Sequence, residues 1–71
     1  MTEIYGTDRC KWCDAAKTLA FERGEDYRWL DVRVRSNHDE MMSRAPGVKT
    51  VPQIFVDDVY VGGYAEYRSM K

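Results

Sequence analysis

The sequence predicts one small domain of the α/β class, with strands and helices in the order βαβαββα. Two observations lead to this prediction. Near the N-terminus, two β-favouring runs are separated by a helix-like stretch of crossover length, which is the pattern of a parallel βαβ unit. Further along, two more β-favouring runs flank Asp57-Asp58, which predicts a hairpin with a two-residue turn. A chain of 71 residues has room for one small core.

Residue types and helix breakers place the elements of the first half. Residues 2–6 and 27–32 favour strands. Residues 11–23 predict the helix between them, and a glycine directly after it ends the helix. Phe21 lies off the apolar stripe of this helix, so we expect its side chain to be partly exposed or covered by a neighbouring element. The stripe consists of Trp12, Ala16, Leu19 and Ala20.

The second half predicts a short helix, the hairpin and a last helix. Ser36 or Asn37 is expected to cap the short helix, which Pro46-Gly47 ends. Residues 51–56 and 59–61 form the two strands of the hairpin. Residues at three-residue spacing then predict a final helix of barely two turns: Tyr64, Tyr67 and Met70.

Composition and charge exclude several classes of function. The formal net charge is −1 with acidic and basic residues interspersed, so there is no basic surface for nucleic acid. The N-terminus lacks a basic segment followed by an apolar one, and no apolar run reaches membrane-spanning length. We therefore expect a soluble, cytoplasmic monomer with no membrane partner.

The two cysteines of the chain, Cys10 and Cys13, stand three positions apart where the first helix is predicted to begin. This spacing places their Cβ atoms roughly 5–6 Å apart on one helix face, so a local disulfide can form and break with small adjustments. The free N–H groups and the positive end of the helix dipole favour a thiolate at Cys10. Cys13, one turn further in, is expected to be the buried partner.

Redox chemistry is the preferred interpretation of this pair, and two alternatives stay open. A tetrahedral zinc site needs four ligands. Beyond the two cysteines the chain offers one histidine, His38, and aspartates would have to supply the remaining ligand. Two inert thiols are the other alternative. A disulfide that closes so short a loop adds little stability, which favours chemistry over a structural bridge.

Charged and aromatic neighbours of the cysteines have two interpretations each. Arg9 and Lys11 would favour the Cys10 thiolate, whereas the negative charge of Asp14 would oppose it. Alternatively, all three side chains are solvated surface charges. Lys17 could steady a thiolate at Cys13, but a stem that covers the helix surface is the preferred interpretation. Trp12 forms either core packing or a flat docking surface beside the thiol.

Together these segments resemble the glutaredoxins, dithiol members of the thioredoxin superfamily, over nearly the whole chain. The resemblance rests on Ile4-Tyr5, on Cys10-x-x-Cys13 at a helix start, on residues 50–56 and on Gly62-Gly63 before the last helix. It implies a single domain over residues 1–71 with a thioredoxin-like fold, in which helices flank a four-stranded mixed sheet of strand order 2-1-3-4. It also implies that Pro52 is cis and lies against the dithiol.

The resemblance further implies a glutathione-linked thiol–disulfide oxidoreductase that reduces protein disulfides or glutathione mixed disulfides, with glutathione as co-substrate and no bound cofactor. Cys10 attacks, and Cys13 or glutathione resolves the mixed disulfide. One alternative is an electron donor that thioredoxin reductase reduces and that serves ribonucleotide reductase. A less favoured alternative is iron–sulfur or metal binding by dimers that share Cys10. The implied glutathione- or peptide-binding residues are Arg9, Lys11, Trp12, Thr50, Val51, Pro52, Gly63, Tyr64 and Glu66.

The chain departs from the family pattern at three places. Lys11-Trp12 stands between the cysteines, where the usual pair is Pro-Tyr. Thr7 occupies the position of a lysine that often meets the glycyl carboxylate of glutathione. Ala65 follows Tyr64 where many members place an acidic residue for the glutathione amine. Arg9 or Lys11 would replace the first contact, and Glu66 the second.

Overall fold

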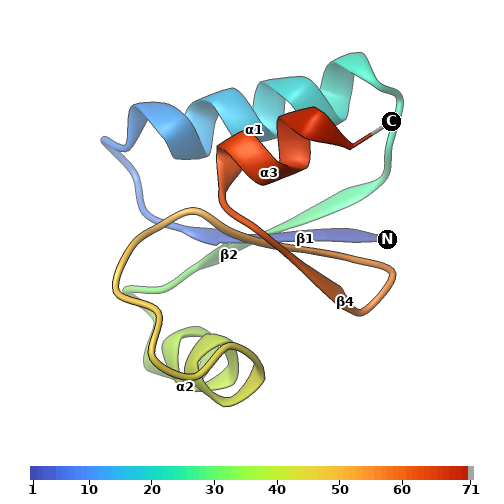
Figure 1. Ribbon diagram of the computed structural model, residues 1–71. Coiled ribbons are helices and arrows are strands. Elements are labelled where there is room, and N and C mark those ends of the chain that lie inside the picture. Colours follow the sequence, from blue (N-terminus) through green and yellow to red (C-terminus); the bar gives the residue numbers. More distant parts are fainter. Residues whose placement is uncertain (71) are drawn as a thin grey trace.

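The computed structural model describes residues 1–70 and confirms the predicted order of strands and helices (Figure 1). Val32, Val51 and Pro52 were expected within strands but lie just outside them. Pro52 has no N–H to donate to a sheet, so it suits the position directly before a strand. The elements are β1 (Thr2–Gly6), α1 (Lys11–Glu22), β2 (Tyr27–Asp31), α2 (Arg35–Arg44), β3 (Gln53–Val56), β4 (Val59–Gly62) and α3 (Tyr64–Ser69).

The four strands form one mixed sheet of order β2-β1-β3-β4, which confirms the order implied by the family resemblance. β1 pairs parallel with β2 and antiparallel with β3, so that Ile4 lies between Trp29 and Ile54. β3 and β4 form the predicted hairpin. Asp57 and Asp58 in its turn both have positive φ, 51° and 67°, as a type I′ turn requires.

The helices cover both faces of the sheet, with α1 and α3 on one face and α2 on the other (Figure 1). Side chains alternate along β1, so successive residues enter different cores. Ile4 enters the core beneath α1 and α3, where two alanines of α1 allow the helix to approach the sheet closely. The buried members of this core are Ile4, Ala16, Ala20, Ile54 and Tyr67.

The core beneath α2 contains charged groups as well as apolar ones. Its apolar members are Tyr5, Leu30, Met41, Ala45 and Phe55. Arg44 Nη1 donates to Glu3 Oε1 and to the Tyr5 hydroxyl, each at 2.9 Å. The Tyr5 hydroxyl donates to Glu40, and burial together with this hydrogen bond raises the pKa of Tyr5 to about 12. Since each of these polar groups has a partner, the network compensates the cost of its burial.

α3 has only six residues and is tied to α1 by one arginine. Arg23, the C-terminal cap of α1, donates to the carbonyl oxygens of Tyr67 at 3.1 Å, Arg68 at 3.0 Å and Met70 at 2.8 Å. These contacts satisfy carbonyls that a helix end leaves free. The hydroxyl of Tyr67 donates to Glu25, which fixes the buried face of α3.

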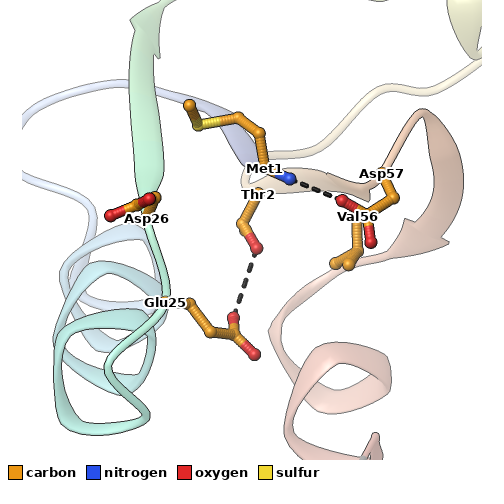
Figure 2. Close-up of a pocket in the computed structure, with 6 residues that line it drawn as sticks. All are labelled: Met1, Thr2, Glu25, Asp26, Val56 and Asp57. Carbon is orange, nitrogen blue, oxygen red and sulfur yellow. Dashed lines mark hydrogen bonds and ion pairs between the residues drawn. The ribbon is translucent and has the colours of Figure 1, made fainter.

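A shallow cavity lies at the end of β1 remote from the cysteines (Figure 2). Polar contacts close its sides. The Met1 amine donates to Asp57 Oδ1 at 2.5 Å, and Thr2 Oγ1 donates to Glu25 Oε1 at 3.2 Å. These contacts join the chain start to the β3–β4 turn and to the segment after α1.

Within residues 1–70, no helix has both the length and the apolar character needed to cross a bilayer.

Two expectations about helices need correction. α2 begins at Arg35 with Val34 as its N-cap, so neither Ser36 nor Asn37 is the cap. Asn37 lies inside α2, and its Nδ2 donates to the Asp31 carbonyl at 3.0 Å, which ties α2 to the end of β2. Trp12 is 52% exposed and does not belong to the buried stripe of α1. Phe21 is 79% exposed, so of the two expectations for this residue exposure holds and cover by a neighbouring element does not.

Candidate active site

The two cysteines lie at the start of α1 and are joined by a disulfide, with their Cα atoms 5.2 Å apart. Cys10 is the N-cap of the helix, and its Sγ accepts a hydrogen bond from the Cys13 N–H at 3.2 Å. Cys10 is partly exposed, whereas Cys13 in the first turn is fully buried. A sulfur at this helix end is stabilised as a thiolate by free N–H groups and the dipole. Cys10 is therefore placed to attack and Cys13 to resolve.

The loop that delivers Cys10 is linked to the end of β2 through Arg33. Arg33 Nη1 contacts Asp8 Oδ1 at 2.9 Å and Arg33 Nη2 contacts Asp31 Oδ2 at 2.7 Å, which links the loop to the end of β2. The hydrogen bonds from Arg33 lower the pKa of Asp31. Arg9, directly before Cys10, has a left-handed backbone with φ 54°. The chain thereby turns sharply into the helix.

Gly6 provides the space in which Cys13 is buried. A Cβ atom at this position would lie 2.6 Å from Cys13 Sγ and 2.7 Å from the Trp29 ring. Contacts that short do not occur in proteins, so a glycine is needed here. The sequence pattern had identified Gly6 only as the end of a strand. Its role depends on how Cys13 of α1 and Trp29 of β2 pack over β1, so periodicity and spacing could not reveal it.

The segment Thr50-Val51-Pro52 lies against the dithiol. The Val51–Pro52 peptide bond is cis, which confirms the expectation drawn from the family resemblance. The Val51 carbonyl oxygen lies 3.9 Å from Cys10 Sγ. Pro52 is buried and Val51 is partly exposed. The backbone of this segment thus forms a wall beside the reactive sulfur.

A groove of about 410 Å³ runs between this wall and the start of α3. Most of the residues implied as substrate contacts line it, together with Ala65, which was not among them. Arg9 and Lys11 do not line it. Lys11 Nζ instead lies 5.0 Å from the centroid of the Trp12 ring. The lining residues are Trp12, Thr50, Val51, Pro52, Gly63, Tyr64, Ala65 and Glu66.

Two aromatic rings connect the helices that border the groove. Trp12 of α1 stacks on Tyr64 of α3, with centroids 5.4 Å apart and planes inclined by 26°. Of the two interpretations of Trp12, its exposure fits the surface beside the thiol. Glu66 Oε1 accepts from the Gly63 N–H at 2.7 Å and so closes the first turn of α3. The groove therefore has a flat apolar wall and an acidic group at its α3 end.

Lys17 and His38 lie outside this arrangement. Lys17 Nζ is 4.1 Å from the centroid of the Trp29 ring and 3.6 Å from Asp14 Oδ1, so its side chain covers the helix surface, as the preferred interpretation held. His38 is exposed, with Nδ1 3.9 Å from Asp39. In the part of the chain that the structure describes, no three His, Cys, Asp or Glu side chains are grouped to hold a metal ion.

Comparison with known proteins decides the family. The family model described as Glutaredoxin matches residues 2–61, which is most of the chain. The chain belongs to the glutaredoxin family. As a glutaredoxin it is a thiol–disulfide oxidoreductase, and Cys10 and Cys13 are the redox-active pair of its Cys-x-x-Cys motif.

Similar glutaredoxins agree in sequence and in structure. Glutaredoxin 1 of Escherichia coli is 37% identical over 73 aligned residues, which cover 93% of this chain and 86% of that protein. The structure of reduced Escherichia coli glutaredoxin has a TM-score of 0.71 at 35% identity and covers 96% of this chain and 88% of its own. Glutaredoxin 1 from Francisella tularensis, solved with cacodylate, has a TM-score of 0.78 at 25% identity, with coverage of 96% and 87%.

Proposed function

We propose that this glutaredoxin uses glutathione to reduce glutathione mixed disulfides and protein disulfides in the cytoplasm. One observation carries the proposal: the sulfur of the partly exposed Cys10 lies at a helix N-terminus, 3.9 Å from the backbone carbonyl of the partly exposed Val51. A tripeptide in extended form has the right chemistry for such a wall, because its own N–H and C=O groups can pair with a free backbone segment.

The groove offers complementary groups for both ends of glutathione. Glu66 lines its α3 end and would attract the amine of the γ-glutamyl residue. The glycyl carboxylate would be met by Arg9 or Lys11. Both lie outside the groove but flank Cys10 in sequence, and Lys11 Nζ lies 5.0 Å from the ring centroid of Trp12, which lines the groove. The Trp12 ring, with Tyr64 behind it, gives the bound chain an apolar surface.

The reaction proceeds through two thiol–disulfide exchanges. The Cys10 thiolate attacks the glutathione sulfur of a mixed disulfide, a bond forms between these two sulfurs, and the substrate thiolate leaves and takes up a proton. A second glutathione thiolate then attacks the glutathione sulfur on Cys10. Glutathione disulfide is released and the Cys10 thiolate is restored.

Protein disulfides need the second cysteine. After Cys10 has formed a mixed disulfide with the protein, the Cys13 thiolate attacks Cys10 Sγ and releases the protein thiol. The product is the Cys10–Cys13 disulfide that the structure contains. Two molecules of glutathione reduce it by successive exchange and become glutathione disulfide.

Substitution of each cysteine tests these roles. Cys10→Ser should abolish turnover of both substrate classes, since no attacking sulfur remains. Cys13→Ser should retain most deglutathionylation, which needs one thiol, and lose the reduction of protein disulfides. A coupled assay with glutathione reductase measures both rates. The reverse pattern, with Cys13 essential and Cys10 dispensable, would refute the assignment.

A second candidate keeps the dithiol and changes the reductant. Ala65 lines the groove without offering a charge to the glutathione amine, and Thr7 offers none to the glycyl carboxylate. This favours reduction by thioredoxin reductase, with a protein such as ribonucleotide reductase as the electron acceptor. Reduction rates of the oxidised protein with glutathione and with thioredoxin reductase decide between the two. If thioredoxin reductase reduces the oxidised protein faster than glutathione does, with the same amount of NADPH available to both systems, the second candidate is supported.

A further inference from the structure

Gln53, the first residue of β3, is a buried polar residue whose side chain has a partner at each end. Its exposed fraction is 5%. Nε2 donates to the Thr50 carbonyl oxygen at 2.8 Å and to Thr50 Oγ1 at 3.3 Å, while Oε1 accepts from the Tyr60 hydroxyl at 2.5 Å. A carbonyl oxygen only accepts, so the amide nitrogen must face Thr50 and the amide orientation is fixed.

These hydrogen bonds span the segment that borders the groove. Thr50 and Gln53 are the first and last residues of the four-residue stretch that contains Val51 and Pro52. The amide of Gln53 therefore joins the two ends of this stretch, and Tyr60 connects it to β4, the neighbouring strand. None of the three polar groups belongs to the dithiol, and none of them contacts Cys10 through these hydrogen bonds.

The direction of the Thr50 carbonyl fixes a backbone donor in the groove. The Thr50–Val51 peptide bond is trans, so its C=O and N–H groups point in opposite directions. With the carbonyl held by Gln53, the Val51 N–H points away from the core. Among residues 1–70 this N–H has no acceptor. It is the group that an extended peptide in the groove needs as a partner.

We propose that Gln53 and Tyr60 are positioning residues that set the orientation of the Thr50–Val51 peptide and thereby the affinity for peptidic disulfides. The inference rests on the proposed function, since it concerns the binding of glutathione and protein segments to the Val51 backbone. Cys10 reactivity does not depend on them. Their loss weakens binding of substrates that have amide groups and leaves sulfur exchange itself intact.

Gln53→Glu tests the amide with the least change in shape. A carboxylate cannot donate to the Thr50 carbonyl and repels it, so KM for a glutathione mixed disulfide should rise about tenfold, while kcat stays within about twofold. Protonation of the introduced carboxyl restores a donor. The ratio of variant to wild-type kcat/KM should therefore rise as the pH is lowered, which loss of packing alone would not produce.

Tyr60→Phe tests the other end and covers the case in which the first variant does not fold. It should raise KM about threefold, because Gln53 keeps its bonds to Thr50 but loses the group that holds its oxygen. Tyr27→Phe is the matched control. Tyr27 lies on β2 at the opposite edge of the sheet, and its removal should leave KM unchanged.

A disulfide without amide groups separates this inference from the proposed function. Reduced wild type and both variants should reduce bis(2-hydroxyethyl) disulfide, without glutathione present, at rates within about twofold of one another. Equal slowing of both substrates in the variants would overturn the inference, as would an unchanged KM for the mixed disulfide. If the wild type shows no preference for the glutathione mixed disulfide, the proposed function fails as well.

Discussion

The two faces of the sheet are held by different interactions. Beneath α1 and α3 the core is apolar and tightly packed, and small residues allow the helix with the dithiol to lie close to β1. Beneath α2 the core contains Glu3, Arg44 and the Tyr5 hydroxyl in one hydrogen-bonded network. Both faces bury one tyrosine whose hydroxyl donates to a glutamate, Tyr5 to Glu40 and Tyr67 to Glu25.

The apolar face and the face with the polar network have different requirements, because only the first positions the dithiol. A cysteine that must form a bond with a second sulfur needs a fixed position, and close packing of its neighbours provides that position. The same packing leaves little space for larger side chains. Glu3, Arg44 and Tyr5 beneath α2 do not line the groove, although Val51, which does, packs against the same core, so the polar network itself serves stability. Changes at the dithiol packing should therefore affect stability and activity together, and changes in the Glu3–Arg44–Tyr5 network should affect mainly stability.

The largest effect is expected for Gly6→Ala on the dithiol face. The added methyl would overlap Cys13 Sγ and the Trp29 ring, so unfolding free energy should fall by about 3 kcal/mol and turnover should fall with it. Gly63→Ala is the steric control for stability, because its nearest contact would be a milder 3.3 Å from Glu66 Oε1. Urea unfolding and the coupled assay measure the two quantities. Full activity in Gly6→Ala would contradict the steric role of this glycine.

Arg44→Met comes next and probes the face beneath α2. It keeps the apolar stem and removes the charge that faces Glu3, whose side chain is 11% exposed. We expect a loss of about 2 kcal/mol, because Glu3 keeps only the more distant Arg28, 3.7 Å away. Turnover of the folded protein should stay within about twofold. Adding Glu3→Gln should recover part of the loss, and a double-mutant cycle measures that coupling. An additive cycle would argue against a direct ion pair.

High pH should act on both faces by a smaller amount. Burial, and hydrogen bonds to glutamate, raise the pKa of Tyr5 and of Tyr67 to about 12, above the value of 10.0 for a free tyrosine. Between these values the unfolded chain has lost protons that the folded protein keeps, so stability falls as pH rises. At about pH 11 the loss is roughly 1 kcal/mol for each tyrosine.

Unfolding by urea at about pH 9 and pH 11 measures this loss, and Tyr5→Phe and Tyr67→Phe assign it to the two faces. Each variant should remove its own share of the pH dependence. If only one variant does so, the tyrosine of the other face is not protected as its contacts indicate.

The sequence predicted the fold well because its breakers coincide with real element ends. Pro46-Gly47 follows α2, Gly24 follows α1 and Gly62 ends β4. The start of α2 was missed because Val34 caps it with no side-chain hydrogen bond, and so without a residue-type signal. The exposure of Trp12 was ambiguous from helical spacing, since a first-turn residue can face either the core or a neighbouring helix.

The groove depends on contacts between distant segments, so local patterns gave little of it. Family resemblance indicated Pro52 as cis and Val51 as a peptide-binding residue, whereas an X-Pro pair alone predicts only a break. The requirement for glycine at position 6 and the bond between Gln53 and Tyr60 involve residues that meet only when the elements pack together. Ala65 lacks chemistry of its own, and its place in the lining follows from its position on α3.

The bonds from Arg23 to the end of α3 have a consequence for the order of folding. A helix of six residues is too short to persist alone in water, so α3 forms only when α1 and the sheet are already in place. Arg23 and its carbonyl partners are more than forty positions apart along the chain, so this closure is among the costliest loops to form. The helix with the dithiol can thus form before α3 adds Tyr64 and Glu66 to the lining of the groove. Substrate selectivity is then a property that the nascent chain acquires last.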